Sequence, residues 1–151
     1  MALFSALQKL LSAPEPAPAP DLRLSVAILL LEAARQDDVF EDRERATIEK
    51  LLKQRFDLSE AECHALMQAA QSRADALVQL HGHTSAIAAQ MRPDERVGLV
   101  EMLWDVAYAD GVLDPEEDLL IRRIAGLIYV SDRDRVLARQ RVMQRKNIAV
   151  L

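Results

Sequence analysis

An internal repeat is the feature of this sequence that most restricts its fold. Residues 20–59 align with residues 93–131 at an offset of 73 positions, and the alignment runs without a gap for more than thirty residues. The pairs of identical residues include Ala34 and Ala107, Asp37 and Asp110, Val39 and Val112, Glu44 and Glu117, and Ile48 and Ile121. Duplicated units bury their apolar faces against each other, so we expect two similar helical pairs about a pseudo-twofold axis, with their loops as neighbours.

Periodicity and composition predict an all-helical fold. The chain is rich in Ala, Leu, Arg and Glu, has only four Gly, and contains no alternating run long enough for a strand. We expect one compact bundle of about seven helices, built from two pseudo-symmetric repeats, over residues 21–147. The expected helices cover about residues 21–36, 42–56, 59–80, 85–91, 93–109, 115–128 and 131 onwards. Ser59 with Glu62, and Ser131 with Asp134, have the spacing of N-terminal capping residues.

The first twenty residues form two predicted elements outside this bundle. Residues 1–12 are expected to form a short amphipathic helix, because their large apolar residues share one helical face. These residues are Leu3, Phe4, Leu7, Leu10 and Leu11. Residues 13–20 alternate proline with other residues, which predicts an extended linker. The helix either covers a groove on its own domain or, through residues 2–12, docks on a membrane surface or a partner helix.

Charge and cysteine content narrow the partners and the compartment. A net charge of −5 argues against nucleic-acid binding, which depends on an excess of Lys and Arg. The single Cys63 excludes an intramolecular disulfide and indicates a reducing compartment. No secretory signal and no bilayer-spanning apolar run is recognisable. We therefore expect a cytoplasmic protein, which in the membrane-docking alternative is peripheral to the inner membrane face.

Two polar helix faces are expected to be solvated. The basic C-terminal stretch contains Arg133, Arg135, Arg139, Arg141, Arg145 and Lys146. It forms either a solvated face or a surface for an acidic partner or anionic lipid. In the helix that begins near Asp94, a second stripe lies within about 40° of that residue and is also expected to face water. This stripe consists of Gly98, Glu101, Asp105 and Tyr108.

Each repeat has an acidic loop between its two predicted helices, and these loops are the candidate site. At about 100° per residue, Asp37 and Asp110 fall on the apolar side of their helices, near the negative end of the helix dipole. A carboxylate placed there requires positive charge from a cation, from Arg or Lys, or from backbone N–H groups. Carboxylate oxygens suit Ca²⁺ or Mg²⁺, and two neighbouring loops would supply more ligands than one.

Structural roles compete with metal binding in the second loop. Asp114 suits the N-cap of the following helix, Pro115 suits its first position and Glu117 falls at its third. Gly111 suits the left-handed residue that ends the preceding helix. Caps and ion pairs are therefore an alternative explanation for these residues.

No other motif points to catalysis or to an organic cofactor. The sequence contains no Gly-rich phosphate loop, nucleophile elbow or dinucleotide fingerprint. His81-Gly82-His83 is expected to be a solvated turn that interrupts a helix. Trp104 is expected to pack in the core.

The second acidic loop carries a resemblance to a known family. Residues 107–117, Ala-Tyr-Ala-Asp-Gly-Val-Leu-Asp-Pro-Glu-Glu, resemble the "ADG…E" signature of the TerB-like family, named for tellurite-resistance protein TerB. Residues 34–44 resemble its first motif, with Gln-Asp-Asp in place of Ala-Asp-Gly. The resemblance covers about residues 21–135 and implies a compact helical domain with internal pseudo-symmetry. It also implies an acidic cluster for which metal binding has been proposed, here Asp37, Glu44, Asp110 and Glu117.

These observations together predict a non-enzymatic module for interaction or stress response, related to tellurite resistance, which binds Ca²⁺ or Mg²⁺. The expected metal ligands are Asp37, Glu44, Asp110, Asp114 and Glu117. A protein partner is expected, but its identity does not follow from the sequence. One alternative is a metal-free adaptor like the similar domains of membrane-tethered DnaJ-type co-chaperones. Another is a metal-assisted hydrolase that uses paired carboxylates.

Overall fold

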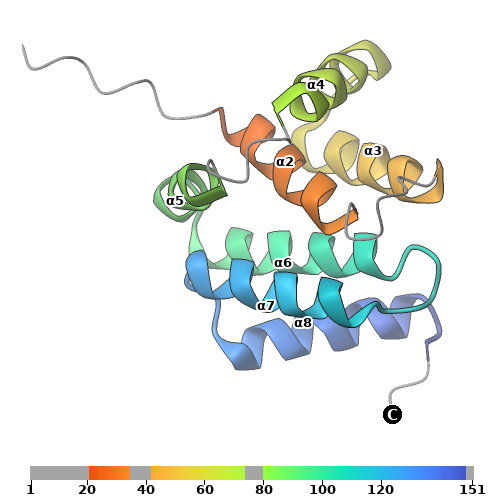
Figure 1. Ribbon diagram of the computed structural model, residues 1–151, viewed down its shortest axis with the longest axis vertical. Coiled ribbons are helices and arrows are strands. Elements are labelled where there is room, and N and C mark those ends of the chain that lie inside the picture. The colour runs from red at the N-terminus through yellow and green to blue at the C-terminus, as the bar shows by residue number, and fades with distance from the viewer. Residues whose placement is uncertain (1–20, 35–41, 74–79, 149–151) are drawn as a thin grey trace, which may run out of the picture.

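The computed structural model describes residues 21–34, 42–73 and 80–148, and in these ranges the chain forms seven α-helices and no strand (Figure 1). The helices are α2 (Leu22–Ala34), α3 (Asp42–Phe56), α4 (Glu60–Arg73), α5 (Leu80–Gln90), α6 (Pro93–Ala107), α7 (Pro115–Leu127) and α8 (Asp132–Arg145). The predicted all-helical bundle is thus confirmed. The predicted N-terminal helix at residues 1–12 and the linker at residues 13–20 lie outside the described residues.

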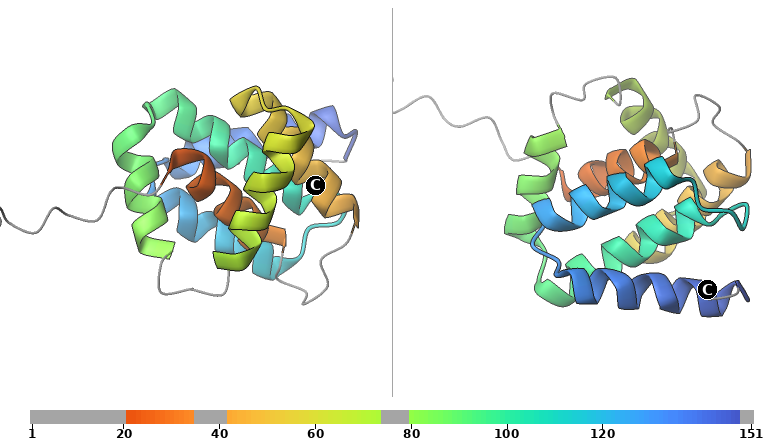
Figure 2. Two further views of the ribbon diagram at one scale, coloured as in Figure 1. Left: turned by 90° about the horizontal axis from the view of Figure 1, so that it is seen from above. Right: turned by 60° about the horizontal axis from the view of Figure 1, so that its bottom comes forward.

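Helix α2 lies at the centre of the bundle, in contact with α3, α4, α5, α6 and α7 (Figures 1 and 2). Its sequence explains this position. The run from Val26 to Leu31 has no polar side, and all six of these residues are buried. A helix that is apolar all round must be covered on every face, and the surrounding helices supply that cover.

The second half of the bundle is built on α6, which packs against α7 and α8 (Figure 2). Helix α6 contributes a large buried face that includes Leu99, Leu103 and Trp104. Helices α7 and α8 close this face with Ile121, Ile124, Ala138 and Val142, all completely buried. Dense apolar contact between these helices accounts for most of the attraction that holds them together.

The predicted helix caps are present. Ser59 and Glu62 exchange hydrogen bonds, with Ser59 N–H donating to Glu62 Oε1 over 3.1 Å and Glu62 N–H donating to Ser59 Oγ over 3.2 Å. At the start of α8, Asp134 N–H donates to Ser131 Oγ over 3.1 Å. Gly111 takes the left-handed conformation expected after α6, with φ of +83°. Such ends are set by a few adjacent residues, which is why the sequence predicts them well.

The helix boundaries that can be compared between the two repeats are shifted by two residues from the sequence offset of 73. Helix α2 begins at Leu22 and α6 at Pro93, while α3 ends at Phe56 and α7 at Leu127. Equivalent apolar positions are nevertheless buried in both repeats, for example Leu30 and Leu103, and Ile48 and Ile121. Burial thus follows the sequence repeat at these positions, whereas a twofold relation between the two helical pairs stays a prediction.

The predicted solvated turn at residues 81–83 is wrong. Helix α5 begins at Leu80, so these residues lie in its first turn, and His83 is buried. The Nδ1 atom of His83 lies 2.9 Å from Ser25 Oγ in α2. A glycine inside a helix costs only about 1 kcal/mol relative to alanine. Burial of neighbouring residues such as Ile87, together with this hydrogen bond, offsets that cost.

Candidate functional site

Two buried glutamates are the most unusual of the predicted site residues. Glu44 lies in the first turn of α3 and Glu117 in the first turn of α7, at equivalent positions of the repeat. Their exposed fractions are only 9% and 6%, although glutamate is rarely buried without compensation for its charge. The N-terminal end of a helix supplies part of that compensation through its dipole. Both side chains also take part in polar interactions within the chain.

Asp110 does not point inward, so that part of the prediction is wrong. Its side chain is exposed, and Oδ1 accepts a hydrogen bond from Val112 N–H over 3.0 Å. Helix α6 ends at Ala107, and the chain then turns, with Gly111 N–H donating to Tyr108 O over 2.9 Å. The angular periodicity of a helix no longer applies beyond its last turn, and this is why the predicted direction failed.

The structure gives Asp114 its predicted capping role. Asp114 Oδ1 accepts a hydrogen bond from Glu116 N–H over 2.9 Å at the start of α7. Asp37, the remaining predicted ligand, lies outside the described residues. Within the described ranges, no three His, Cys, Asp or Glu side chains form a group that could hold a metal ion. The structure therefore does not gather Glu44, Asp110, Asp114 and Glu117 into one ligand set.

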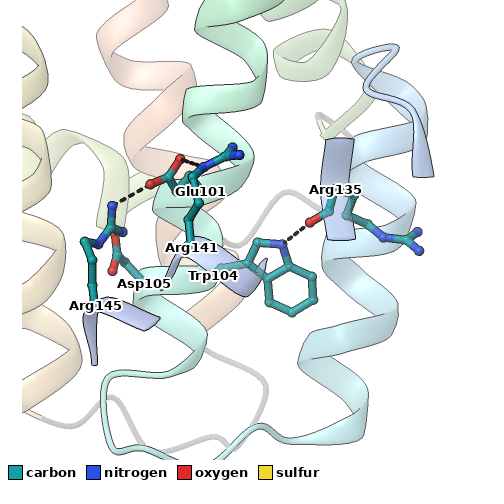
Figure 3. A network of polar contacts seen from close by, with 6 residues as sticks. All are labelled: Glu101, Trp104, Asp105, Arg135, Arg141 and Arg145. Carbon is teal, nitrogen blue, oxygen red and sulfur yellow. Dashed lines mark hydrogen bonds and ion pairs between the residues drawn. The ribbon is translucent and has the colours of Figure 1, made fainter. Parts of the chain in front are cut away.

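A second charged site joins α6 to α8, and sequence periodicity did not predict it (Figure 3). Arg141 Nε donates to Glu101 Oε2 over 3.0 Å, and Arg145 bonds to both Glu101 and Asp105, the latter over 2.8 Å. Burial disfavours the charge of Arg145, but Asp105 and Glu101 outweigh that effect and raise its pKa. The expected solvent exposure of this α6 stripe is thus wrong, because α8 lies along it.

Contacts between α8 and α6 also account for most of the arginines in the basic C-terminal stretch. Trp104, drawn with the ion pairs in Figure 3, is buried. Its Nε1–H donates a hydrogen bond to the backbone oxygen of Arg135 over 3.1 Å. The Arg139 guanidinium lies 5.5 Å from the Trp104 ring centroid and donates to Tyr108 Oη over 2.8 Å. The side chains of Arg139, Arg141 and Arg145 therefore contact the chain's own α6, and that of Arg135 pairs with Asp132, so these arginines do not form the freely solvated face that we expected. Trp104 packs in the core as predicted.

A signal for this interface is present in the sequence. Glu101 and Asp105 are four residues apart in α6, and Arg141 and Arg145 are four residues apart in α8. Matched spacings of opposite charge on two helices could have predicted that the two stripes face each other.

A cavity of about 490 Å³ opens between α3, α6 and α8, next to this interface. Its charged lining residues are Arg55, Arg92, Arg145, Glu95, Glu101 and Asp105. All six take part in ion pairs, including Arg55 with Glu95 at 2.5 Å. The Arg92 N–H and then the Arg55 guanidinium lower the pKa of Glu95, so this carboxylate is held in its charged form. A carboxylate of this kind is a poor proton acceptor for catalysis.

The one thiol of the chain is also unsuited to catalysis. Cys63 is buried in α4, and burial raises its pKa above the ordinary value. Its Sγ lies 3.7 Å from Glu49 O. The reactive form of cysteine is the thiolate, so these surroundings make Cys63 a packing residue.

Comparison with known protein families gives a match. The family model described as tellurite resistance protein TerB matches residues 23–140. No curated protein and no solved structure matches the chain. Within the described ranges, no helix has both the length and the apolar character needed to cross a membrane.

Proposed function

The chain belongs to the TerB family of tellurite resistance proteins, and on this basis we propose that it is a non-enzymatic module that binds a divalent cation at its acidic helix junctions. Ca²⁺ and Mg²⁺ are the ions of choice, because the residues concerned offer only oxygen ligands. The proposal also includes a role in a stress response related to tellurite resistance. This part is supported by the family match alone. The single Cys63 supports a reducing, cytoplasmic location.

The observation that carries this proposal is the burial of Glu44 and Glu117 at equivalent positions. Each lies in the first turn of the second helix of its repeat, which follows the acidic loop that contains Asp37 or Asp110. Burial of a charged carboxylate is costly, and the helix start and the polar interactions of both side chains within the chain offset part of that cost. A cation shared by the loop and the helix start would add further positive charge in each repeat. Asp110 uses one oxygen for Val112 N–H, and its exposed carboxylate retains further acceptor sites.

The non-enzymatic part of the proposal is supported by the paired charges around the cavity and by the buried thiol. The carboxylates of the cavity are engaged by arginines, and the pKa of Glu95 is lowered. General acid–base catalysis instead favours groups whose pKa lies near the working pH. The hydrolase alternative therefore gains no support from these residues.

A second candidate, the metal-free adaptor, is favoured by a different observation. Asp110 and Asp114 each satisfy a backbone N–H of their own loop. If Glu44 and Glu117 have similar structural roles, the acidic loops stabilise the fold and the surface of the bundle binds a protein partner. The two candidates differ in one measurable property, which is the response of stability to metal ions.

The test is thermal unfolding in a chelator, followed by addition of Ca²⁺, Mg²⁺ or Mn²⁺. An ion at about 100 times its dissociation constant stabilises the folded state by about 2.7 kcal/mol, so the midpoint should rise in at least one metal. Glu117→Gln and Glu44→Gln should abolish the rise, because each removes a buried charge without changing side-chain size. The matched control is Glu116→Gln, an exposed neighbour in the same helical turn. An unchanged midpoint in every metal would reject the cation and favour the adaptor.

A further inference from the structure

A groove of about 420 Å³ lies between α5 and the C-terminal end of α7. Ala88 and Ala89 of α5 face Gly126 and Leu127 of α7 across it, and Tyr129 stands at its edge. The described residues that line the groove carry no charge. Thr84 and Ser85 add hydroxyl groups to a lining that otherwise consists of small and apolar side chains and Tyr129. An uncharged concave surface of this kind is suited to receive larger apolar side chains from another segment.

Tyr129 has an unusual conformation for an aromatic residue. Its φ is +62°, in the left-handed region, and its side chain is 79% exposed. At the corresponding junction after α3, the left-handed residue is Asp57, whose short polar side chain tolerates this conformation better. The chain therefore accepts about 1 kcal/mol of backbone strain while it holds a large ring in water beside the groove. The left-handed conformation belongs to the turn that ends α7, in which Val130 N–H donates to Ala125 O over 2.9 Å, and this turn leaves the ring exposed beside the groove, where it can contact a bound segment.

We propose that this groove binds the chain's own N-terminal segment, residues 2–12, through the leucine and phenylalanine side chains on one face of that segment. The segment is apolar along this face and carries a single charge, at Lys9. A helix of this length is unstable by itself and requires a surface to pack against. The uncharged groove would supply that surface, and Tyr129 would cover part of the docked face.

Residues 2–12 have the shortest path to the groove, because they precede α2 in the chain and α2 begins beside α5. The first turn of α2 lies beside α5, since Ser25 Oγ is 2.9 Å from His83 Nδ1, and the next residue of α5, Thr84, lines the groove. The start of α2 and the end of α7 both lie at the α5 end of the bundle (Figures 1 and 2). The proline-rich residues 13–20 would span about 25 Å at about 3.1 Å per residue, enough to bring residues 2–12 to this end.

Tethering also favours this occupant over a separate molecule. A short linker gives the attached segment an effective concentration in the millimolar range. Even weak docking is then well populated, whereas a second copy of the chain or an external peptide would need much higher affinity. Docking of residues 2–12 in the groove requires no cation at the acidic helix junctions.

Disulfide trapping tests the inference in the full chain with Cys63→Ala as background. Leu7→Cys combined with Ala89→Cys should form an intramolecular disulfide under mild oxidation about tenfold faster than the control, because docking raises the local concentration of the two thiols. The control combines Leu7→Cys with Glu116→Cys, an exposed site at the opposite end of α7. Equal rates in the two variants would overturn the inference, and so would disulfides that form only between molecules.

A groove-filling variant gives an independent check. A Cβ placed at Gly126 meets no heavy atom within 4 Å, so Gly126→Leu should fill the groove without disturbing the fold. It should slow the Leu7–Ala89 cross-link about tenfold, whereas Gly98→Leu, equally unhindered but in α6, should leave it unchanged. Circular dichroism would verify that both variants fold. A cross-linking rate that is unaffected by Gly126→Leu would reject the groove as the resting site of residues 2–12.

Discussion

Glycine residues have two opposite roles in this protein. Gly98 lies inside α6, where its flexibility serves no turn and a Cβ would meet no atom within 4 Å. Gly111 follows α6 with φ of +83°, a conformation that other residues adopt only with strain. One glycine thus weakens a helix, and the other permits the chain to leave it.

Alanine substitutions at these two positions should therefore have opposite effects on stability. Gly98→Ala should raise the free energy of unfolding by about 1 kcal/mol, because alanine has the higher helix propensity and loses less entropy on folding. Gly111→Ala should lower it by about 1 kcal/mol, because alanine is strained in the left-handed region. Urea unfolding of the two variants beside the parent protein measures both changes. A lower free energy of unfolding in Gly98→Ala would contradict this prediction, because it would mean that the space beside Gly98 is occupied in solution.

At the scale of elements, the docking of α8 on α6 combines apolar packing with an ionic network. Val142 and Ala138 bury the apolar side of α8, while Arg141 and Arg145 pair with Glu101 and Asp105 at the edge. The acidic partners are only 20% and 16% exposed, whereas the arginines remain about half exposed to water. The apolar contacts supply most of the stability, and the ion pairs fix the register of the two helices.

A double-mutant cycle should detect this ionic contribution. Glu101→Gln and Arg145→Gln should show a coupling of about 0.5–1 kcal/mol in the free energy of unfolding, and high salt should reduce it. A cycle between Glu101→Gln and Arg133→Gln, an exposed residue at the start of the same helix, should give a coupling near zero. Equal coupling in the two cycles would mean that the interaction reflects general charge balance and not the specific pair.

At the scale of the whole molecule, α2 connects the two repeats. It contacts both helices of the second repeat, α6 and α7, as well as α3, α4 and α5. Helix α8 is attached to the bundle through α6 and α7, and both of these helices contact α2 (Figure 1). Loss of packing in α2 should therefore affect the entire bundle and not a single helix.

Leu30→Ala is expected to reduce the free energy of unfolding by about 2–5 kcal/mol, because it leaves a cavity at a completely buried position. Unfolding should remain a single transition, with the same midpoint by circular dichroism and by fluorescence of Trp104, which lies in the other repeat. The control Leu119→Ala removes an exposed side chain of α7 and should change stability by no more than about 0.5 kcal/mol. Separate midpoints for the two probes would show that the repeats unfold independently.

The sequence alone determined the features that depend on neighbouring residues. The helical class, the cap at Asp114 and the left-handed Gly111 all follow from interactions within a few positions. The resemblance to the TerB family belongs to the same group, since it rests on a short stretch around Asp110.

Only the tertiary structure decided which polar faces are covered. Periodicity identified the stripe of Glu101 and Asp105, but it could not show that α8 would bring Arg145 against it. Helical periodicity also predicted that Asp110 points inward, but α6 ends before that residue. The sequence likewise predicted that His83 is exposed to solvent, but α2 covers it. The physical reason is that a polar side chain is compatible either with water or with a complementary partner. Which of the two it meets depends on elements far away in the sequence.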